Sequence, residues 1–212
     1  TASAPVAAST VPSKFKILEM TEKDFAAWTK GKNSLWLVNC ERQYIFAHGE
    51  EVVIYGGSDN ALREYFDKHS MNWKGFDLKT AWRQLDLTNK QEAEWDSCLA
   101  AYVVKAGSIE AFKETYESYV RPLPDLPDAG SLYQAQLDLE SVLLAKLNET
   151  QMVPILNTIE LPIIDILTAM EHKGVLIDSK FLEKESKALA EDIKEVEKQI
   201  HAEAGESFNI AS

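Results

Sequence analysis

The residues best suited to catalysis or metal binding are few and scattered. The four histidines, His48, His69, His172 and His201, are far apart, and none is spaced i, i+4 from another or adjacent to a cysteine. This spacing indicates no zinc site. The glycines form neither a phosphate-binding loop nor a dinucleotide-binding turn, and there is no nucleophile elbow. We therefore interpret each histidine and cysteine as a core or surface residue.

Carboxylates on a strand and at helix ends offer a second kind of chemistry. Two magnesium ions about 4 Å apart can hydrolyse a phosphodiester when several carboxylates converge on them. On the first expected strand the candidate is Asn39-Cys40-Glu41, which supplies one carboxylate where two are wanted. Glu41 alone would leave two divalent ions nearly uncompensated, so the sequence predicts no hydrolysis here. The alternative for Glu41 is a solvated acid at a hairpin corner.

These residues lie in a segment with strand and hairpin patterns. Between residues 34 and 57, short runs rich in β-branched and aromatic residues have the sequences LWLVNC, QYIFA and EVVIYG. After Gly57 the strand pattern largely ends and helices are expected. Short polar side chains before apolar-periodic runs predict their N-caps: Ser58, Asp77, Asp96 or Ser97, Ser108, Ser131 and Ser179.

The C-terminal part is predicted to be helical. The proline-rich segment 121–130 interrupts regular structure, and a helix follows. A second long helix is expected near 154–172, with a kink or boundary at Pro162 and an end at Gly174. A short extended piece, 175–178, precedes a final helix of about 25 residues. Its one narrow apolar stripe favours an antiparallel bundle helix over a coiled-coil dimer; the stripe is Leu182, Leu189, Ile193, Val196 and Ile200.

Composition excludes several classes of protein. The chain has 212 residues, 34 acidic and 22 basic, and a formal net charge of −12, unlike a free-standing nucleic-acid binder. Two cysteines form no disulfide framework, which favours a reducing compartment, and no uninterrupted apolar run approaches the length of a membrane span. Residues 1–13 are interpreted as a linker. Four tryptophans could stack on bases, but buried packing is the favoured interpretation: Trp36, Trp73, Trp82 and Trp95.

Several spaced motifs resemble one enzyme family. Residues 159–212 resemble the opening of the polymerase domain of bacterial DNA polymerase I, a family A DNA polymerase. The matching elements are Ile159-Glu160-Leu161-Pro162, Met170-Glu171, Gly174-Val175, Ile177-Asp178, Ala204-Gly205-Glu206 and Phe208-Asn209. Upstream, KGFDLK from Lys74 and WDSCLAAY from Trp95 resemble landmarks of the family's proofreading 3′→5′ exonuclease domain.

The resemblance implies an α/β fold and a domain organisation. It implies a ribonuclease H-like exonuclease fold, with a mixed sheet flanked by helices, followed by an all-helical thumb-type extension. The expected divisions are a linker over 1–13, a degenerate exonuclease-like domain over 14–149, and a truncated N-terminal part of the polymerase domain over 150–212. The absence of an initiator methionine suggests a piece of a longer protein.

The same resemblance implies that the exonuclease site is degenerate. The family uses an Asp-x-Glu pair on the first strand, an Asp at the start of the helix that the first landmark opens, and a late Asp four residues after a Tyr. Carried over position by position, these fall on Asn39 and Glu41, Ala81 and Leu137, the last counted from Tyr133. Asp138, one residue further, is the nearest acid to the last position. The sequence therefore predicts no catalytic residue and no metal site.

The residues that perform polymerase chemistry in the family have no counterparts in this sequence. The family's metal-binding palm aspartates are absent, so the chain is not expected to polymerise by itself, and Mg²⁺ is implied only for the parent enzyme. By position in the family's thumb-tip motif, Asn209 and Ser212 are candidates for contact with the primer-template backbone. Lys194 and Lys198 are interpreted as surface charges that pair with acids on the same helix, rather than as a DNA-binding site.

The function expected from the sequence is therefore that of a supporting part. The leading hypothesis is a fragment of a cytoplasmic bacterial DNA polymerase I, monomeric and active in replication and repair, whose exonuclease-like domain is a structural spacer. Its implied partner is the DNA primer-template, and no association with a membrane is implied. The alternative is a binding module, in which the vacated exonuclease cleft holds single-stranded DNA or a protein. A residual exonuclease is third.

Overall fold

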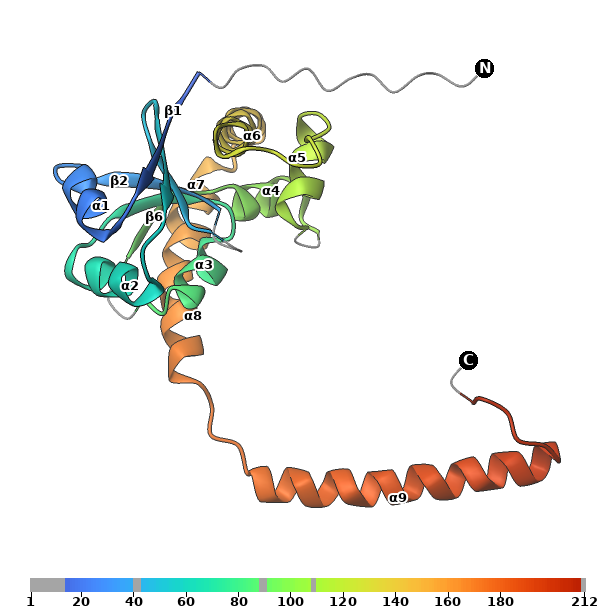
Figure 1. Ribbon diagram of the computed structural model, residues 1–212. Helices are drawn as coiled ribbons and strands as arrows, with labels where there is room; N and C mark the ends of the chain where they lie inside the picture. The colour runs from blue at the N-terminus through green and yellow to red at the C-terminus, as the bar shows by residue number, and fades with distance from the viewer. Residues whose placement is uncertain (1–13, 40–42, 88–90, 108–109, 211–212) are drawn as a thin grey trace. The chain divides into compact units, whose positions relative to one another are not determined.

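The computed structural model describes residues 14–39, 43–87, 91–107 and 110–210 (Figure 1). Within them one mixed sheet has the strand order β1-β4-β3-β2-β5-β6. The neighbours β2, β3 and β4 are antiparallel, whereas β1 is parallel to β4, and β5 is parallel to both β2 and β6. The strands are β1 (Lys16–Met20), β2 (Ser34–Asn39), β3 (Ile45–His48), β4 (Glu51–Tyr55), β5 (Asn72–Gly75) and β6 (Glu92–Asp96). The predicted α/β class with a mixed sheet flanked by helices is confirmed.

Helices connect and cover these strands. In chain order they are α1 (Glu22–Thr29), α2 (Asp59–Lys68), α3 (Leu78–Gln84), α4 (Ser97–Lys105), α5 (Phe112–Tyr119), α6 (Ala129–Glu149), α7 (Val153–Ile155), α8 (Leu161–Lys173) and α9 (Ser179–Ala204). A π-helical segment, η1 (Leu156–Glu160), joins α7 to α8. The expected boundary at Pro162 thus coincides with a change of helix type just before the proline, because a proline cannot donate the hydrogen bond that regular helix requires.

Most of the predicted helix starts are confirmed by the capping contacts. The Ser58 hydroxyl accepts from the Ala61 amide, and Asp77 and Asp96 cap α3 and α4. Two starts differ from the expectation. Asp128 rather than Ser131 caps α6, and Asp178 rather than Ser179 caps α9, since these carboxylates accept from the first-turn amides of Ser131 and Phe181. The expected cap Ser108 lies outside the described residues.

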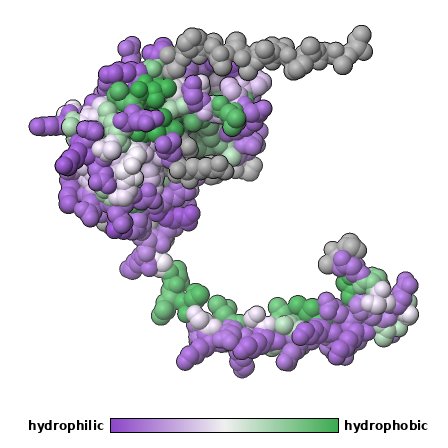
Figure 2. Space-filling view, viewed as in Figure 1, coloured by the Kyte–Doolittle hydropathy of each residue, from purple (hydrophilic) through white to green (hydrophobic). Residues whose placement is uncertain are grey.

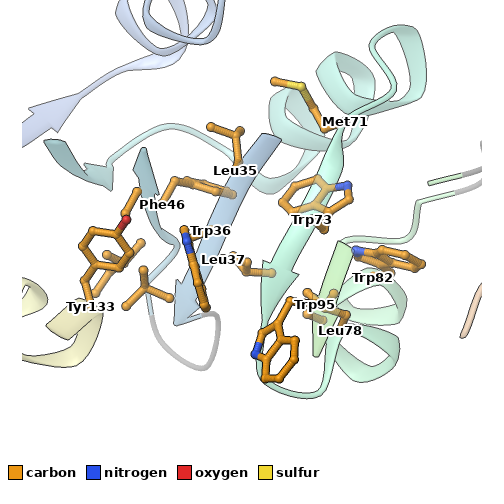
Figure 3. Close-up of a cluster of buried hydrophobic side chains, with 14 of the residues drawn as sticks. Leu35, Trp36, Leu37, Phe46, Met71, Trp73, Leu78, Trp82, Trp95 and Tyr133 are labelled. Atoms are coloured by element: carbon orange, nitrogen blue, oxygen red, sulfur yellow. The ribbon is translucent and has the colours of Figure 1, made fainter. Parts of the chain in front are cut away.

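An aromatic core fills one face of the sheet, under α1 and α2. The ring of Phe25 from α1 lies 4.9 Å from that of Phe46 on β3, and Phe66 from α2 lies 4.7 Å from Trp73 on β5. Side chains alternate across a strand, so neighbouring Leu35 and Trp36 on β2 serve opposite faces. Figure 3 shows this arrangement around Trp73 and Trp36. The four tryptophans that the sequence places in the core are all buried: Trp36, Trp73, Trp82 and Trp95.

The long helix α6 covers the opposite face. Its buried leucines Leu139, Leu143 and Leu147 have no solvent exposure, and the helix contacts β1, β2 and β4. α4 packs alongside α6 (Figure 1). Fully burying a leucine side chain contributes about 1.5–3 kcal/mol. This helix therefore contributes strongly to the stability of the sheet, and it also carries the late positions of the expected exonuclease site.

The segment Val153–Lys173 is unusually apolar. It is 21 residues long, and an 18-residue window within it has a mean hydropathy of 1.5, which is enough by length and composition to cross a membrane. This refines the expectation from sequence, which found no apolar run of such length. One side of the segment belongs to the protein core, because Leu156, Leu161 and Ile164 are buried there. Only 22% of the apolar window is buried, where the segment contacts α3 and β6.

The chain divides into two compact units after Lys173. Gly174 ends α8 with a φ of +64°, as its predicted C-cap role requires. The first unit therefore extends beyond the division at 149/150 that the family resemblance implies. In the second unit, residues 175–178 form no regular element, and α9 has no buried residue. Figure 2 shows the predicted apolar stripe along one side of α9 and hydrophilic residues along the other.

Candidate functional site

The first candidate position lies at the end of a central strand. Asn39 is the last residue of β2, between β3 and β5, and the pairing with β3 shifts register between Leu37 and Asn39. Strand ends beside a register shift re-aim the chain and are common next to active sites. The strand predicted to hold the acid pair thus exists and ends where the pair should lie. Glu41 lies outside the described residues.

The second candidate position is part of the core. Ala81 lies in the first turns of α3 and is 1% exposed. The acid at the start of this helix is Asp77, whose carboxylate accepts from the Thr80 amide at 3.3 Å. Asp77 adopts a φ of +53°, a left-handed conformation that an Asp tolerates better than most residues. The first landmark of the resemblance therefore retains an acid at the helix start, and that acid serves as a cap.

The third candidate position lies on α6. Leu137 is half-buried and packs against the core. Its neighbour Asp138 accepts from the Gln134 amide at 2.7 Å and from the Tyr116 hydroxyl at 3.4 Å. The Arg121 guanidinium lies 3.3 Å from the same carboxylate. The one acid near this position is thus held by an ion pair and hydrogen bonds to α5, the segment after it, and α6 itself.

An aromatic cluster fills the space between β2 and α6. Tyr133 is 3% exposed, and its ring centroid lies 4.8 Å from that of Phe15 and 6.0 Å from that of Trp36. Burial, with a smaller contribution from the charge of Glu140, raises the pKa of Tyr133 to about 12. The tyrosine from which the late Asp is counted is therefore a neutral core residue packed against two other rings.

A lysine lies beside this cluster. The Lys74 ammonium is 3.1 Å from Glu140 on α6 and 3.3 Å from Glu94 on β6, and it lies 5.7 Å from the Trp36 ring centroid. Burial opposes its charged form, but the hydrogen bonds and charges of the two glutamates outweigh burial and raise the pKa of Lys74. One partly buried ammonium thus offsets part of the charge of these two glutamates.

One buried carboxylate, Asp96, was recognised from sequence only as a cap. It accepts from the Leu78 amide at 2.8 Å and the Asp77 amide at 3.1 Å, besides the Cys98 and Leu99 amides of its own helix. Burial raises the pKa of Asp96 to about 6, against the opposing effect of these amide donors. Asp96 therefore joins the N-termini of α3 and α4. The sequence shows an Asp before each of these helices, but it does not show that β5 and β6 pair and so bring the two helix N-termini together.

No cation site is apparent in the part of the chain that the structure describes. Across 14–39, 43–87, 91–107 and 110–210, histidine, cysteine, aspartate and glutamate side chains form no group of three or more that could hold a metal. Ala81 and Leu137 bring no ligand, and Asp138 is already paired with Arg121. We therefore derive no chemical step through a metal ion for these residues.

The expected DNA-contact residues lie after α9. Asn209 is exposed, and Ser212 lies outside the described residues. The imidazole Nε2 of His201 lies 2.9 Å from the carbonyl oxygen of Phe208, and the two rings are 5.4 Å apart. These contacts hold the segment that carries Asn209 against the end of its own helix. Lys198 pairs with Glu195 at 3.8 Å, as expected for a surface charge that pairs with an acid on the same helix.

Comparison with known proteins supports the resemblance. No protein-family profile matches the chain. DNA polymerase I of Geobacillus stearothermophilus is 28% identical over 169 residues, which are 74% of this chain and 19% of that protein. DNA polymerase I of Bacillus subtilis (strain 168) is 26% identical over 68% of this chain and 17% of its own length. That of Synechocystis is 45% identical over 58 residues, or 27% of this chain and 6% of that protein.

A solved structure matches nearly the whole chain. The polymerase domain of Pol1 from M. smegmatis, in complex with DNA primer-template and dNTP, superposes with a TM-score of 0.67 over 93% of this chain and 39% of that one. At 18% identity this likeness concerns the fold. The chain spans about a fifth of the length of DNA polymerase I from Geobacillus stearothermophilus and from Bacillus caldotenax, 19% and 20%. Together these findings confirm that the chain resembles part of a bacterial DNA polymerase I, a family A DNA polymerase.

Proposed function

We propose that this chain is part of a DNA-directed DNA polymerase, and that its exonuclease-like unit is a catalytically inactive support for the polymerase domain. The observation that carries the proposal is the aromatic cluster of Phe15, Trp36 and Tyr133, which fills the space between β2 and α6. The expected site positions Asn39 and Leu137 lie on these same two elements, so the cluster occupies space beside the place where metal ions and a DNA end would be expected.

The side chains at the candidate positions support inactivity. Two-metal hydrolysis needs carboxylates that converge on the ions to balance their charge. Ala81 and Leu137 are apolar and packed into the core, and Asp138 is engaged by Arg121 and Tyr116. A metal site built on the remaining acids would have to break these contacts first.

A supporting role follows from where the core lies. α6 packs across the sheet with fully buried leucines, and α8 packs against α3 and β6. The residues that resemble the start of a polymerase domain therefore begin within the same compact unit as the sheet. Folding depends on this apolar burial and not on catalytic acids, so the fold persists where the chemistry is lost.

The wider function is inferred from the relatives. We infer DNA synthesis by the parent enzyme in the bacterial cytoplasm, in replication and repair, with Mg²⁺ bound by residues outside this chain. The M. smegmatis neighbour was solved with primer-template, which supports DNA as the partner. Asn209 and Ser212 are the proposed contacts with the duplex backbone, and a monomer is the proposed state.

A nuclease assay tests the inactive unit. The 212-residue chain is incubated with 5′-labelled single-stranded DNA in magnesium or manganese, beside an active proofreading exonuclease as positive control. We expect no shortening. Shortening that disappears in Glu41→Ala or Asp77→Asn, purified in parallel, would refute the proposal, because a contaminating nuclease would survive either substitution.

A second assay tests support of the polymerase domain. In the whole polypeptide encoded by the gene, Leu143→Ala removes a side chain with no exposure from the contact between α6 and the sheet. We expect lower thermal stability and shorter primer extension at elevated temperature, with unchanged fidelity. The matched control is Leu144→Ala, at a position that is 40% exposed. A change in fidelity, or tight binding of single-stranded DNA by the 212-residue chain at physiological salt, would favour a functional cleft instead.

A further inference from the structure

A small cavity lies beside α8, where that helix packs against α3. It has a volume of about 180 Å³. Its floor consists of buried residues: Trp82, Leu87, Gln91 and Thr168. Its rim consists of more exposed residues of α8: Asp165, Ala169 and His172. Because the rim lies at the surface, a small molecule can enter the cavity without unfolding the core.

One hydrogen-bond donor of the floor is unsatisfied. The indole Nε1–H of Trp82 has no acceptor among the described residues, although the residue is only 1% exposed. The other polar groups of the floor are engaged. Gln91 accepts from the Trp73 indole at 2.8 Å and donates to a backbone carbonyl of α2 at 3.3 Å. The Thr168 hydroxyl donates to a carbonyl of its own helix at 2.8 Å. Since a buried donor without a partner is rare and costly, Trp82 favours an acceptor bound in the cavity.

The rim supplies an acceptor of its own. Asp165 is half-buried and has no ion pair among the described residues. His172 is held from outside the cavity, because its Nδ1 lies 3.3 Å from the Asp86 carboxylate, which lies 2.8 Å from the Arg63 guanidinium. The carboxylate of Asp165 therefore favours a ligand that carries a hydrogen-bond donor. Together with the net charge of −12, it disfavours an anionic ligand.

The size of the cavity and the groups that line it define a class of ligand. An apolar cavity of about 150 Å³ admits benzene, so this slightly larger one admits a single six-membered ring with small substituents. We propose that the cavity binds a small uncharged aminopyrimidine-type ring, whose ring nitrogen accepts from Trp82 Nε1–H and whose amino group donates to Asp165. Leu87 and Ala169 supply apolar contacts to the ring. This binding does not depend on the polymerase function proposed above.

Cytosine and uracil provide a matched pair of probes for the 212-residue chain. The two rings have the same size, but uracil has an N–H in place of the acceptor nitrogen of cytosine, and a carbonyl oxygen in place of its amino group. The indole N–H signals of the five tryptophans are followed by ¹⁵N NMR, and Trp82→Phe assigns the Trp82 signal. We expect cytosine to shift this signal saturably, with a dissociation constant on the order of 1 mM. Uracil should bind at least about tenfold more weakly, because both hydrogen bonds become mismatched.

A pair of variants tests the rim. Asp165→Ala should weaken cytosine binding at least about fivefold, whereas Asp192→Ala, at an exposed position on α9, should leave it unchanged. Any of three results would overturn the proposal: a Trp82 signal that stays unshifted up to the solubility limit of cytosine, as when water alone serves the indole; equal binding of uracil; or a common shift of several indole signals, as in nonspecific stacking. The comparison of the two probes uses the unsubstituted chain, so misfolding of a variant cannot produce these results.

Discussion

The carboxylate of Asp96 provides the sharpest test of how this fold is held together. It accepts hydrogen bonds from four backbone amides at the starts of α3 and α4, and it is 1% exposed. Asp96→Asn replaces one oxygen by an amide group that cannot accept a bond. At least one buried amide then loses its partner, which costs about 1–3 kcal/mol. Asp96→Ala removes all four acceptor contacts, and loss of two helix caps and their buried partners should cost about 3–5 kcal/mol.

Asp96 also predicts how the free energy of unfolding changes with pH. Burial raises the pKa of Asp96 to about 6 from an ordinary 3.8, so the folded state holds its proton more tightly than the unfolded state. The stabilisation is present at low pH and is lost as the pH rises through 6. The difference between the two pKa values corresponds to ~3 kcal/mol in total, of which ~2 kcal/mol lies between about pH 4.5 and pH 7.5. The stability deficit of Asp96→Asn should therefore shrink by ~2 kcal/mol over that range.

Urea unfolding followed by tryptophan fluorescence measures this difference. The chain has five tryptophans, so unfolding gives a large change in emission. The matched control is Asp59→Asn, which makes the same chemical change at an exposed position in the first turn of α2. Its pH profile should follow that of the parent. A deficit of Asp96→Asn that grew with pH would refute the reasoning, because the amide donors and helix N-termini would then outweigh burial.

Two further predictions concern the face of the sheet under α6. Leu139→Ala should lower the free energy of unfolding by about 2–5 kcal/mol, because Leu139 has no exposure, and Leu144→Ala should lower it far less in the same urea titration. Phe15→Ala should uncover Tyr133, so that its pKa falls from about 12 toward 10.0, as measured by ultraviolet titration of the phenol. An unchanged Tyr133 pKa would mean that Phe15 does not seal this space.

Sequence periodicity predicts the central strands well and the outer strands poorly. β2, β3 and β4 carry continuous β-branched and aromatic runs, and all three were expected. The strands β5, with sequence NWKG, and β6, with sequence EAEWD, were not. Each is four or five residues long and has only one large apolar residue, Trp73 or Trp95. Their strand conformation depends on pairing, of β5 with β2 and of β6 with β5, which local propensity does not contain.

The candidate site shows the same division between local and non-local information. The capping role of Asp77 is visible in sequence because the cap and the amide it binds are three residues apart. The cover over Tyr133 is not visible, because Phe15 and Trp36 come from distant parts of the chain and meet only when β2 packs under α6. The role of Asp96 in capping α3 similarly requires the parallel pairing of β5 with β6.

If the unit is inactive, as we propose, packing would also make that loss of exonuclease chemistry difficult to reverse. Ala81 is 1% exposed among apolar neighbours, so a carboxylate placed there would lose its hydration without gaining a partner. Burying an unpaired charge costs several kcal/mol, and the group neutralises before it can bind a metal. Leu137 packs against the same core as Tyr133, so a second carboxylate would meet the same penalty. Restoring the acids alone would thus destabilise the unit, because activity would first require the aromatic cluster to open a hydrated space.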